Sequence, residues 1–440
     1  MNGLMRNQIW RQVVIKFRYV HVSKNDDRMH GCWRSVEYAR RSSLSGVLET
    51  GELRIRRRGA DRIRGGHLWV YRSDVVEPAN PIAAGSIVLV RDERGTAIGK
   101  ALYSSASQIA LRFLTRGSAA NVPINEAFLR YRIAAADGYR NQIGVDPKLS
   151  RRIFSEGDLL PGLIVDRYED ILVVQNLCQG IDKLEPIITA LLQEHYQPRS
   201  IVFRNDARVR ELEGLPIEQH TIGEPVPESI TVNEDGKEYE VALQKGQKTG
   251  TFLDQRENHR AARRYAHGKA LDGCTYGGGF ALQIAEVCQS VDAVDISASS
   301  VEAARANAHR NGLQNVLCIE ANIFDYLREA SAQGKRYDTI ILDPPAFARN
   351  RDNLEGSIRG YKEINNRAMR ILNDGGILMT CSCSHHVSEA LFAEMLAEAA
   401  HDAGCWARVI ERRIQSADHP VLLTVPETLY LKCFILQIKH

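Results

Sequence analysis

The chain has 440 residues, of which 44% are apolar and 25% are charged, and its formal net charge is +3. This length predicts two or three domains, and this composition is typical of a soluble globular protein. No apolar run approaches the roughly twenty residues of a membrane-spanning helix, so we expect no contact with a membrane. The nine cysteines include no C-x-x-C pair. We therefore expect no metal site, and mostly reduced, buried thiols in a cytoplasmic protein.

Residues 1–46 differ from the rest of the chain. They are rich in arginine and lysine and show neither helical nor strand periodicity. They contain no apolar core of the secretory type, so a signal peptide is not expected. Two interpretations remain: a basic arm that touches phosphate, or a stretch that is disordered or lies upstream of the true start. The missing periodicity favours the second interpretation.

Residues 47–120 are predicted to form a small β barrel. Within residues 52–117, short strand-like runs are separated by turn residues, a spacing typical of such barrels. Arginines cluster at the start of this part, and we expect Arg56, Arg57 and Arg58 to contact RNA phosphates. The alternative is a solvated strand face whose charges bind nothing.

Residues 121–228 are predicted to form a small α+β domain. A helical, arginine-rich pattern covers residues 126–141, strand-like runs follow, and a second helical pattern covers residues 181–195. Helices and strands in this order indicate a small mixed domain. A connection rich in proline and glutamate at residues 223–228 marks the boundary with the last domain.

Residues 229–440 are predicted to form an open α/β sheet. A hairpin with a turn at Asp235-Gly236 and a helix at residues 257–267 come first. From Leu271 onward, strand-like runs alternate with helical patterns, which predicts a parallel sheet with crossover helices. These helical patterns cover residues 281–287, 299–311, 324–332 and 361–372, and an apolar strand without a following helix ends the chain.

A glycine loop opens this sheet, in the stretch D-G-C-T-Y-G-G-G-F from Asp272 to Phe280. Glycine serves where the backbone bends sharply and approaches a ligand, because a Cβ atom would block both. Asp295 closes the next apolar run, where a carboxylate accepts hydrogen bonds from ribose hydroxyls. The pair indicates a nucleotide-like cofactor; the alternative is a buried turn in an ordinary sheet.

Four strand ends carry acidic or polar residues: Asp272, Asp295, Asn322 and Asp343. Ligands of open parallel sheets bind outside these ends, and such groups suit an adenosine cofactor. The chain has neither G-x-x-x-x-G-K-[ST] nor the strict G-x-G-x-x-G at the glycine loop, so no phosphate cradle is expected. S-adenosylmethionine has no phosphate and fits this pattern.

Asp343 and Cys383 carry the predicted chemistry. Two prolines follow Asp343 and stiffen the turn, so its carboxylate is expected to bond the amine and ring nitrogen of a base. Cys383 is a candidate nucleophile that would attack C6 of cytosine and activate C5. Cys381 lies on the same strand face by period two, so spacing cannot choose between the two thiols. The alternative is a pair of buried structural cysteines.

These motifs resemble a known family. The stretches D-G-C-T-Y-G-G-G-F, A-V-D-I-S, L-D-P-P-A-F, R-G-Y-K-E-I-N and C-S-C-S are similar to class I S-adenosylmethionine-dependent methyltransferases. The set Q-K-T-G-T-F-L-D-Q-R, E-G-D-L-L-P-G-L-I-V-D-R-Y, A-D-H-P and P-E-T-L-Y-L-K resembles the bacterial large-subunit ribosomal RNA methyltransferase I family, which makes 5-methylcytosine in 23S rRNA. The stretch G-G-H-L-W-V-Y resembles that family's RNA-binding PUA domain.

The resemblance implies a multidomain α/β fold. It consists of a PUA-like β barrel, a small α+β middle domain and a C-terminal Rossmann-like class I methyltransferase domain. It also implies S-adenosylmethionine as cofactor, 23S rRNA or a large-subunit precursor as partner, a possible homodimer, and Cys383 as nucleophile. The expected cofactor-binding residues are Asp272, Thr275, Gly277, Gly278, Gly279, Phe280, Asp295, Ser297, Asn322, Asp343 and Pro344. The expected substrate-binding residues are Arg56, Arg57, Arg58, Asp254, Arg256, Pro345 and Phe347.

The chain departs from the family pattern at several positions. Asn322 stands where an acid that bonds the adenine amine is usual, and Gly277 stands where a threonine is usual. His385 and His386 follow the cysteine motif, where smaller residues are expected, and no cysteine follows Asp343-Pro-Pro. Two other functions stay open: an RNA N-methyltransferase acting on guanine or adenine without a thiol, and a non-catalytic RNA-binding ribosome assembly factor.

Overall fold

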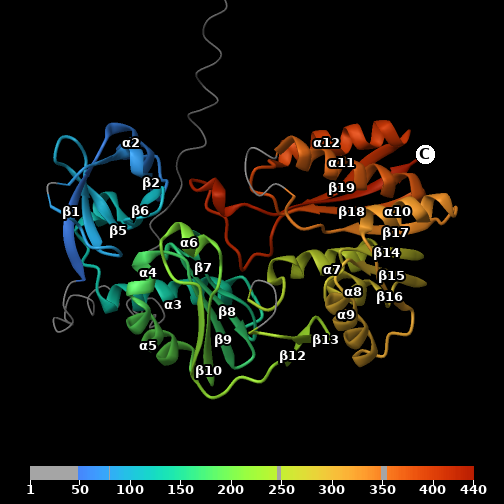
Figure 1. Cartoon of the computed structure of the whole chain (residues 1–440), viewed down its shortest axis with the longest axis horizontal. Helices are drawn as coiled ribbons and strands as arrows, with labels where there is room; N and C mark the ends of the chain where they lie inside the picture. The colour runs from blue at the N-terminus through green and yellow to red at the C-terminus, as the bar shows by residue number, and fades with distance from the viewer. Residues whose placement is uncertain (1–47, 79, 245–248, 348–353) are drawn as a thin grey trace, which may run out of the picture. The chain divides into compact units, whose positions relative to one another are not determined.

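The computed structural model describes residues 48–78, 80–244, 249–347 and 354–440. The strands in these ranges form sheets of six, five and seven strands and one two-stranded sheet (Figure 1). The prediction for residues 1–46 lies outside the described residues. None of the helices in the described ranges is long and apolar enough to cross a membrane.

The six-stranded sheet has the order β2-β6-β5-β4-β1-β3. Its strands are β1 (Glu49–Ile55), β2 (Trp69–Tyr71), β3 (Val75–Val76), β4 (Ile87–Arg91), β5 (Ala97–Tyr103) and β6 (Ile109–Arg116). Alternate residues of these strands, such as Val88 and Val90, pack into one core, as the period of two requires.

The basic run at the start of this part forms a helix, α2 (Arg57–Arg64), between two of the predicted strand-like runs, so the alternative of a solvated strand face does not apply to it. The helix buries Gly59, Ala60 and Ile63 on one side and exposes Arg57, Arg58 and Arg64. This spacing follows a helical period of 3.6 and not the strand period of two.

The five-stranded sheet has the order β11-β10-β9-β8-β7. Its strands are β7 (Leu149–Phe154), β8 (Leu163–Tyr168), β9 (Ile171–Asn176), β10 (Ser200–Asn205) and β11 (Glu218–Gly223). The helices of this part are α3 (Glu126–Gln142), α4 (Gln179–Lys183), α5 (Glu185–Tyr196) and α6 (Val209–Leu212). The single helix predicted at residues 181–195 is therefore two helices. Pro186 lies in the first turn of α5, where a proline can begin a helix but cannot continue one.

The hairpin predicted after residue 229 is present as β12 (Ile230–Glu234) and β13 (Lys237–Val241), which pair antiparallel. Its turn residues, Asp235 and Gly236, have φ values of 49° and 86°. Positive φ at both central residues is the type I′ geometry that Asp-Gly favours, so the turn prediction is confirmed.

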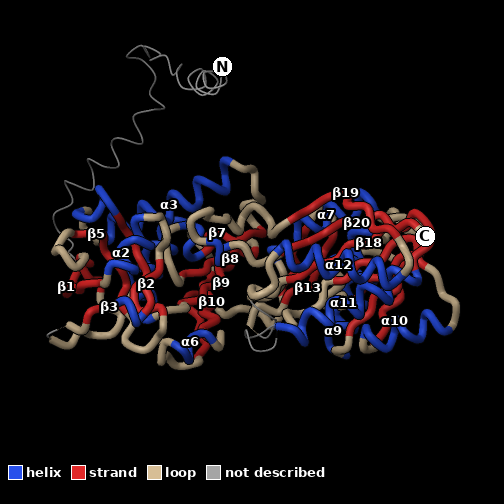
Figure 2. Tube along the Cα trace, turned by 90° about the horizontal axis from the view of Figure 1, so that it is seen from above, coloured by secondary structure: helices blue, strands red, loops and turns tan. Residues whose placement is uncertain are grey.

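The seven-stranded sheet has the order β16-β15-β14-β17-β18-β20-β19. Its strands are β14 (Lys269–Gly273), β15 (Ser290–Asp295), β16 (Val316–Glu320), β17 (Tyr337–Leu342), β18 (Leu372–Ser382), β19 (Trp406–Arg413) and β20 (Lys432–Lys439). The first five strands in this order run parallel, while β20 pairs antiparallel with β18 and β19. Figure 2 shows β18, β19 and β20 side by side.

Helices cover both faces of this sheet, because neighbouring strand residues point to opposite sides. Ala270 packs in a core with residues of α7 (Arg256–Tyr265), α8 (Gly279–Ile284) and α9 (Ala298–Arg310). Leu271 packs in a second core with residues of α10 (Ile323–Ala332), α11 (Leu354–Ile371) and α12 (Glu389–Ala403). In Figure 1, α8 and α9 accordingly lie on one side of the strands, and α11 and α12 lie on the other.

Two elements of this sheet region were not predicted. One is α12, whose first turn is capped by the Ser388 hydroxyl, which accepts a hydrogen bond from the Leu391 backbone N–H at 3.1 Å. The other is β19, a mostly exposed edge strand with Trp406 81% exposed. Its apolar and charged residues do not alternate, so the period of two gave no signal.

Candidate active site

The carboxyl ends of four neighbouring parallel strands carry the predicted chemistry. In the register, Gly273 of β14 lies beside Val294 of β15 and Leu342 of β17, and Leu342 lies beside Thr380 of β18. The glycine loop, Asp295, Asp343 and Cys383 directly follow these positions, and we call this group of strand ends the carboxyl edge. The edge is where open parallel sheets bind their ligands.

The glycine loop is a tight turn with several residues in the left-handed region. Cys274, Tyr276 and Gly278 have φ values of 66°, 50° and 89°. A Cβ atom on Gly278 would lie 2.4 Å from the Leu282 side chain, so this position requires glycine for both its φ and its space. At Gly277 such a Cβ would lie 3.7 Å from the Asn307 side chain, an ordinary van der Waals distance, so a Cβ atom meets no clash at that position.

Asp272 is buried at the end of β14. Its Oδ2 atom accepts hydrogen bonds from the Thr275 hydroxyl at 2.6 Å and from the Ala281 backbone N–H at 2.9 Å. Its Oδ1 atom is buried and has no hydrogen-bond partner among the described residues. Burial raises the pKa of Asp272 to about 6, although the two hydrogen bonds act in the opposite direction. A buried oxygen of this kind calls for a donor from outside the chain.

Asp295 is half-buried at the end of β15 and fixes the loop beside it. Its Oδ2 atom accepts from the Tyr276 backbone N–H at 2.9 Å, and its Oδ1 atom accepts from the Ser297 backbone N–H at 2.9 Å. A carboxylate has about four acceptor positions, so further lone pairs remain for a ligand. Ser297 caps α9 through its hydroxyl.

Asn322 and Phe280 serve the fold in addition to their predicted cofactor role. Asn322 is exposed and caps α10, with its Oδ1 atom accepting from the Phe324 backbone N–H at 2.9 Å. One lone pair of that amide oxygen is therefore in use. Phe280 lies in the core against the His259 ring, with ring centroids 4.4 Å apart. The cofactor contacts of both residues stay predictions.

His259 and Glu234 form a buried pair beneath the glycine loop that the sequence analysis missed. The Nδ1 atom of His259 lies 2.6 Å from the Glu234 carboxylate, and the ring is adjacent to Gly279, where a Cβ atom would lie 2.8 Å from it. Burial acts to lower the pKa of His259, but the Glu234 carboxylate outweighs it and the pKa is raised overall. The two residues are far apart in sequence and share no motif, so no sequence signal joins them.

Asp343 and the prolines after it form the third part of the edge. The Asp343 backbone N–H donates to the Gly273 carbonyl at 3.3 Å, which ties the turn to β14. Pro344 is buried and Pro345 is exposed. Phe347 packs against Tyr361 of α11, with ring centroids 4.6 Å apart.

Cys381 and Cys383 occupy different environments, which the period of two did not predict. Strand β18 ends at Ser382, so Cys381 lies in the strand and Cys383 lies in the turn after it. Cys381 is fully buried opposite Cys433 of β20, and its hydrogen bond with Cys433 and its burial raise its pKa. Cys383 is only partly buried. A thiol with a raised pKa holds little thiolate, which argues against Cys381 as a nucleophile.

Lys432 is a second residue of the site that the sequence analysis missed. It begins β20 opposite Ser382 and is 3% exposed. Its Nζ atom donates to the backbone carbonyls of Ser384 at 2.6 Å and of Tyr430 at 2.8 Å. Burial lowers the pKa of Lys432 to about 8, against an opposing attraction from the negative charge of Cys383.

The two histidines after Cys383 are both exposed. The His385 ring lies beside the Tyr430 ring, with centroids 5.7 Å apart. Surrounding protein atoms lower the pKa of His385, although part of the side chain stays open to solvent, and the Lys432 charge lowers it further. His385 is therefore largely neutral at neutral pH.

The predicted substrate-binding residues fall into two groups. Asp254 and Arg256 are more than nine-tenths buried, and Asp254 accepts a hydrogen bond from the Tyr430 hydroxyl at 2.7 Å. Arg56, Arg57 and Arg58 are all exposed, at the start of α2. As substrate-binding residues, both groups stay predictions.

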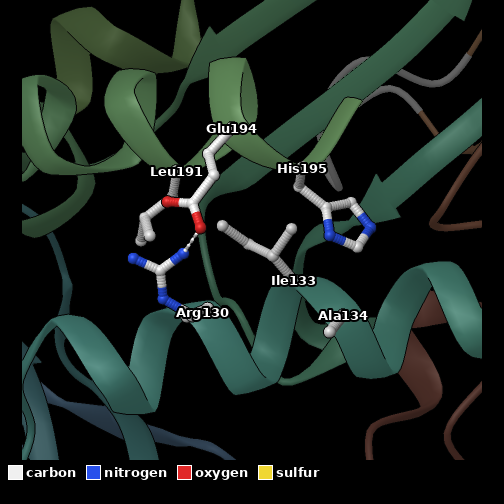
Figure 3. Close-up of a pocket in the computed structure, with 6 residues that line it drawn as sticks. All are labelled: Arg130, Ile133, Ala134, Leu191, Glu194 and His195. Atoms are coloured by element: carbon white, nitrogen blue, oxygen red, sulfur yellow. Dashed lines mark ion pairs between the residues drawn. The ribbon is translucent and has the colours of Figure 1, made fainter. Parts of the chain in front are cut away.

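A hollow of about 350 Å³ lies elsewhere, between α3 and α5 (Figure 3). The Arg130–Glu194 ion pair crosses it, and Ile133, Leu191 and His195 line it. None of the residues of the carboxyl edge takes part. Among the described residues, no group of three histidine, cysteine or acidic side chains is arranged to hold a metal ion.

Comparisons with known proteins agree with this geometry. Residues 53–116 match the family model of PUA-like domains, and residues 173–426 match that of S-adenosylmethionine-dependent methyltransferases. The chain is 38% identical over 379 residues to ribosomal RNA large subunit methyltransferase I of Yersinia pseudotuberculosis, covering 84% of this chain and 95% of that protein. The protein of the same name from Yersinia pestis is 38% identical over 375 residues, covering 84% of this chain and 94% of its own length.

The chain belongs to the ribosomal RNA large subunit methyltransferase I family. It is a methyltransferase whose cofactor is S-adenosylmethionine. A solved putative methyltransferase in complex with SAH has the same fold, with a TM-score of 0.76 at 19% identity, covering 88% of this chain and all 100% of that one. A putative methyltransferase from Streptococcus mutans gives a TM-score of 0.74 at 18% identity, with coverages of 88% and 100%.

The residues at the carboxyl edge fit S-adenosylmethionine. The buried Oδ1 atom of Asp272 needs a donor that the described chain does not supply. Asp295, at the end of the neighbouring strand β15, accepts a hydrogen bond from the Tyr276 backbone N–H of the loop and has lone pairs left for a ligand. An uncharged adenosine with hydroxyl and amine donors meets these needs without a phosphate cradle.

Proposed function

We propose that this protein methylates C5 of a cytosine in 23S ribosomal RNA, or in its large-subunit precursor, through a covalent adduct between Cys383 and the base. The observation that carries the proposal is the contrast between the two thiols: Cys381 is buried opposite Cys433, whereas Cys383 is partly accessible beside Lys432. The relatives' name supplies ribosomal RNA as the substrate class. Ribosomal RNA implies the cytoplasm as the place of action.

The proposed cofactor site is the glycine loop with the strand ends beside it. Asp272 would accept a donor through Oδ1, and Asp295 would accept hydrogen bonds from the ribose hydroxyls. The remaining proposed contacts are Thr275, Gly277, Gly278, Gly279, Phe280, Ser297, Asn322, Asp343 and Pro344. When bound, the cofactor supplies a methyl group on a positively charged sulfur.

Cys383 would act by making C5 of the base a nucleophile. The thiolate sulfur forms a bond to C6, and the electron pair of the C5–C6 double bond moves to C5, which can then accept the methyl group. Asp343 would hold the base by accepting a hydrogen bond from its exocyclic amine and, when the carboxyl carries a proton, by donating one to the ring nitrogen N3. A base then takes the proton from C5, the C6–S bond breaks with its electron pair returning to sulfur, and the double bond forms again.

RNA would be held through the PUA-like part as well as at the carboxyl edge. Arg56, Arg57 and Arg58 are exposed together on α2, and such a cluster can neutralise several phosphates. The proposed substrate contacts are completed by Pro345 and Phe347, in the segment after Asp343, by Asp254, just before α7, and by Arg256, the first residue of α7. The division at residues 47–120, 121–228 and 229–440 and the possible homodimer are part of the same proposal.

The identity of the methylated base tests this function. Large-subunit RNA from a strain lacking the enzyme is incubated with the purified protein and S-adenosylmethionine, digested to nucleosides and analysed by mass spectrometry. We expect new 5-methylcytidine. An N-methylguanosine or N-methyladenosine would instead show the N-methyltransferase, and bound but unmethylated RNA would show a non-catalytic assembly factor.

A pair of aspartate variants provides the control. Asp295→Ala should abolish most methylation by weakening the cofactor site. Asp325→Ala removes an exposed carboxylate of α10 whose ion-pair partner is Arg328, and it should methylate as the unaltered protein does. Equal loss in both variants would mean that Asp295 has no special role.

A further inference from the structure

Lys432 is a buried lysine whose hydrogen-bond partners are not acidic. It is 3% exposed, and its Nζ atom donates to two backbone carbonyls, those of Ser384 and Tyr430. Among the ion pairs of the described residues, none pairs Lys432 with a carboxylate. Burying an ammonium without a counter-charge is costly, so a lysine in this place calls for a functional reason.

Lys432 lies beside the turn that carries Cys383, so the thiolate form of Cys383 would be the negative group next to the ammonium. Burial lowers the pKa of Lys432 to about 8, and the charge of Cys383 is the one electrostatic influence that raises it. The antiparallel register of β18 and β20 brings Lys432 near Cys383, because Lys432 lies opposite Ser382, the residue before Cys383. Its bond to the Ser384 carbonyl holds the backbone on the other side of Cys383.

The turn that carries Cys383 is fixed at further points. The Tyr361 hydroxyl of α11 lies 3.0 Å from the Ser384 hydroxyl, and the Val387 backbone N–H donates to the Ser384 carbonyl at 3.2 Å. The same carbonyl therefore accepts both from Val387 and from Lys432. A turn held in this way keeps the Cys383 thiol in one position relative to the ammonium.

We propose that Lys432 is a positioning residue that holds Cys383 as a thiolate and keeps its turn aimed at the carboxyl edge. The inference rests on the proposed function, because it concerns the nucleophile of that reaction. It adds a residue from β20, on the far side of β18 from the glycine loop, to the catalytic arrangement. The attraction would favour the thiolate both before the bond to C6 forms and after that bond breaks.

The other titratable groups around this pair lie on several elements. Tyr361 of α11 interacts with Cys383, and Asp343 at the end of β17 acts on the neighbouring Cys381. His385 follows in the next loop; surrounding protein atoms lower its pKa, Lys432 and His386 lower it further, and Glu427 acts in the opposite direction. Largely neutral, His385 cannot replace the Lys432 charge at neutral pH, so the lysine should dominate.

The test is the pH dependence of Cys383 alkylation by iodoacetamide in the full-length protein without RNA. Mass spectrometry of the peptide locates the modified thiol. We expect Lys432→Met to raise the pH midpoint of Cys383 alkylation by about one unit or more. Removing a nearby positive charge raises the pKa of a thiol, and shifts of about one to three units are usual for such a change. Lys432→Arg keeps the positive charge, so its alkylation midpoint should stay close to that of the unaltered protein. An unchanged midpoint in a folded Lys432→Met protein overturns the inference.

Lys439→Met is the matched control. It removes a lysine from the other end of the same strand, where the ammonium pairs with Asp374 and is 44% exposed. Its alkylation midpoint should equal that of the unaltered protein. A midpoint that rises as much as in Lys432→Met would show a general effect of strand charge and overturn the inference.

A reciprocal measurement covers the case in which Lys432→Met does not fold. If the two charges attract, then Cys383→Ala must lower the pKa of Lys432, which is followed in the folded protein by NMR of carbon-13-labelled lysine side chains as the pH is varied. An unchanged Lys432 titration midpoint contradicts the inference. Neither readout depends on methylation, so a failure of the Cys383 mechanism and a failure of the Lys432 inference are distinguishable.

Discussion

The Nζ atom of Lys432 lies 2.6 Å from the carbonyl oxygen of Ser384, the residue directly after Cys383. This bond joins the start of β20 to the turn that follows β18, across an antiparallel strand pair. The two cysteines, only two residues apart, lie in different surroundings because β18 ends at Ser382. Cys381 is held within the sheet, whereas Cys383 lies beyond the strand, next to a buried ammonium.

Cofactor affinity should depend on the protonation of Asp272. Burial raises the pKa of Asp272 to about 6, and a protonated carboxyl accepts hydrogen bonds less well than a carboxylate. We expect the affinity for S-adenosylhomocysteine, measured by calorimetry, to fall as the pH is lowered from 7.5 to 5, by at most about tenfold for each pH unit below the pKa.

Two variants separate Asp272 from the other acids of the loop. Asp272→Asn should bind weakly with little change across this pH range, while Asp295→Asn should bind weakly but keep the pH dependence. A full pH dependence in Asp272→Asn would assign it to another group, such as the His259–Glu234 pair.

The raised pKa of Asp272 should also make the stability of the fold depend on pH. The folded state holds the Asp272 proton more tightly than the unfolded chain, so this proton stabilises the fold below about pH 4, and that contribution is lost as the pH rises through about 6. Asp272→Asn should therefore flatten the pH dependence of the free energy of unfolding between these values. A slope equal to that of the unaltered protein would mean that Asp272 titrates normally.

Gly278→Ala should destabilise the protein more than a matched glycine variant elsewhere. At Gly278, alanine meets both a φ of 89° and the Leu282 side chain at 2.4 Å, and left-handed backbone alone costs about 1–3 kcal/mol for such a residue. Gly375→Ala provides the control, because Gly375 has a φ of 84° and no atom within 4 Å. If urea unfolding shows equal losses of unfolding free energy in Gly278→Ala and Gly375→Ala, then the glycine loop rearranges to accommodate the extra Cβ atom.

The arginines at the start of α2 should bind RNA through phosphates. Changing Arg56, Arg57 and Arg58 to alanine should flatten the salt dependence of RNA binding by up to about one slope unit per lost contact. A control variant that changes Arg305, Arg328 and Arg408 removes the same charge from exposed positions outside the PUA-like part. An unchanged slope in the first variant, or equal changes in both, would place the RNA elsewhere.

Much of the sheet could be read from the sequence, because its signals are local. The glycine loop, the acids that close each strand and the Asp235-Gly236 turn are short patterns whose geometry follows from neighbouring residues. Helix α2 was not predicted, because β1 is followed almost directly by it and only the buried Gly59, Ala60 and Ile63 reveal the change of period.

The missed parts of the site depend on contacts between distant segments. Lys432 reaches the turn after Cys383 because β20 pairs with β18 in antiparallel register, and no sequence spacing predicts that pairing. Glu234 reaches His259 from the hairpin strand β12, again across two separate elements. The two cysteines could not be separated by period two, since the end of β18 at Ser382 decides which of them leaves the strand.

The central claim is covalent catalysis by Cys383, and the most direct measurement is the trapping of an adduct with RNA that carries 5-fluorocytosine. Fluorine at C5 cannot leave as a proton, so the thiol should stay bound to C6 after methyl transfer. The account predicts an adduct on Cys383 by mass spectrometry, its loss together with methylation in Cys383→Ala, and its retention in Cys381→Ala. Near-normal methylation of ribosomal RNA by a folded Cys383→Ala protein would contradict it.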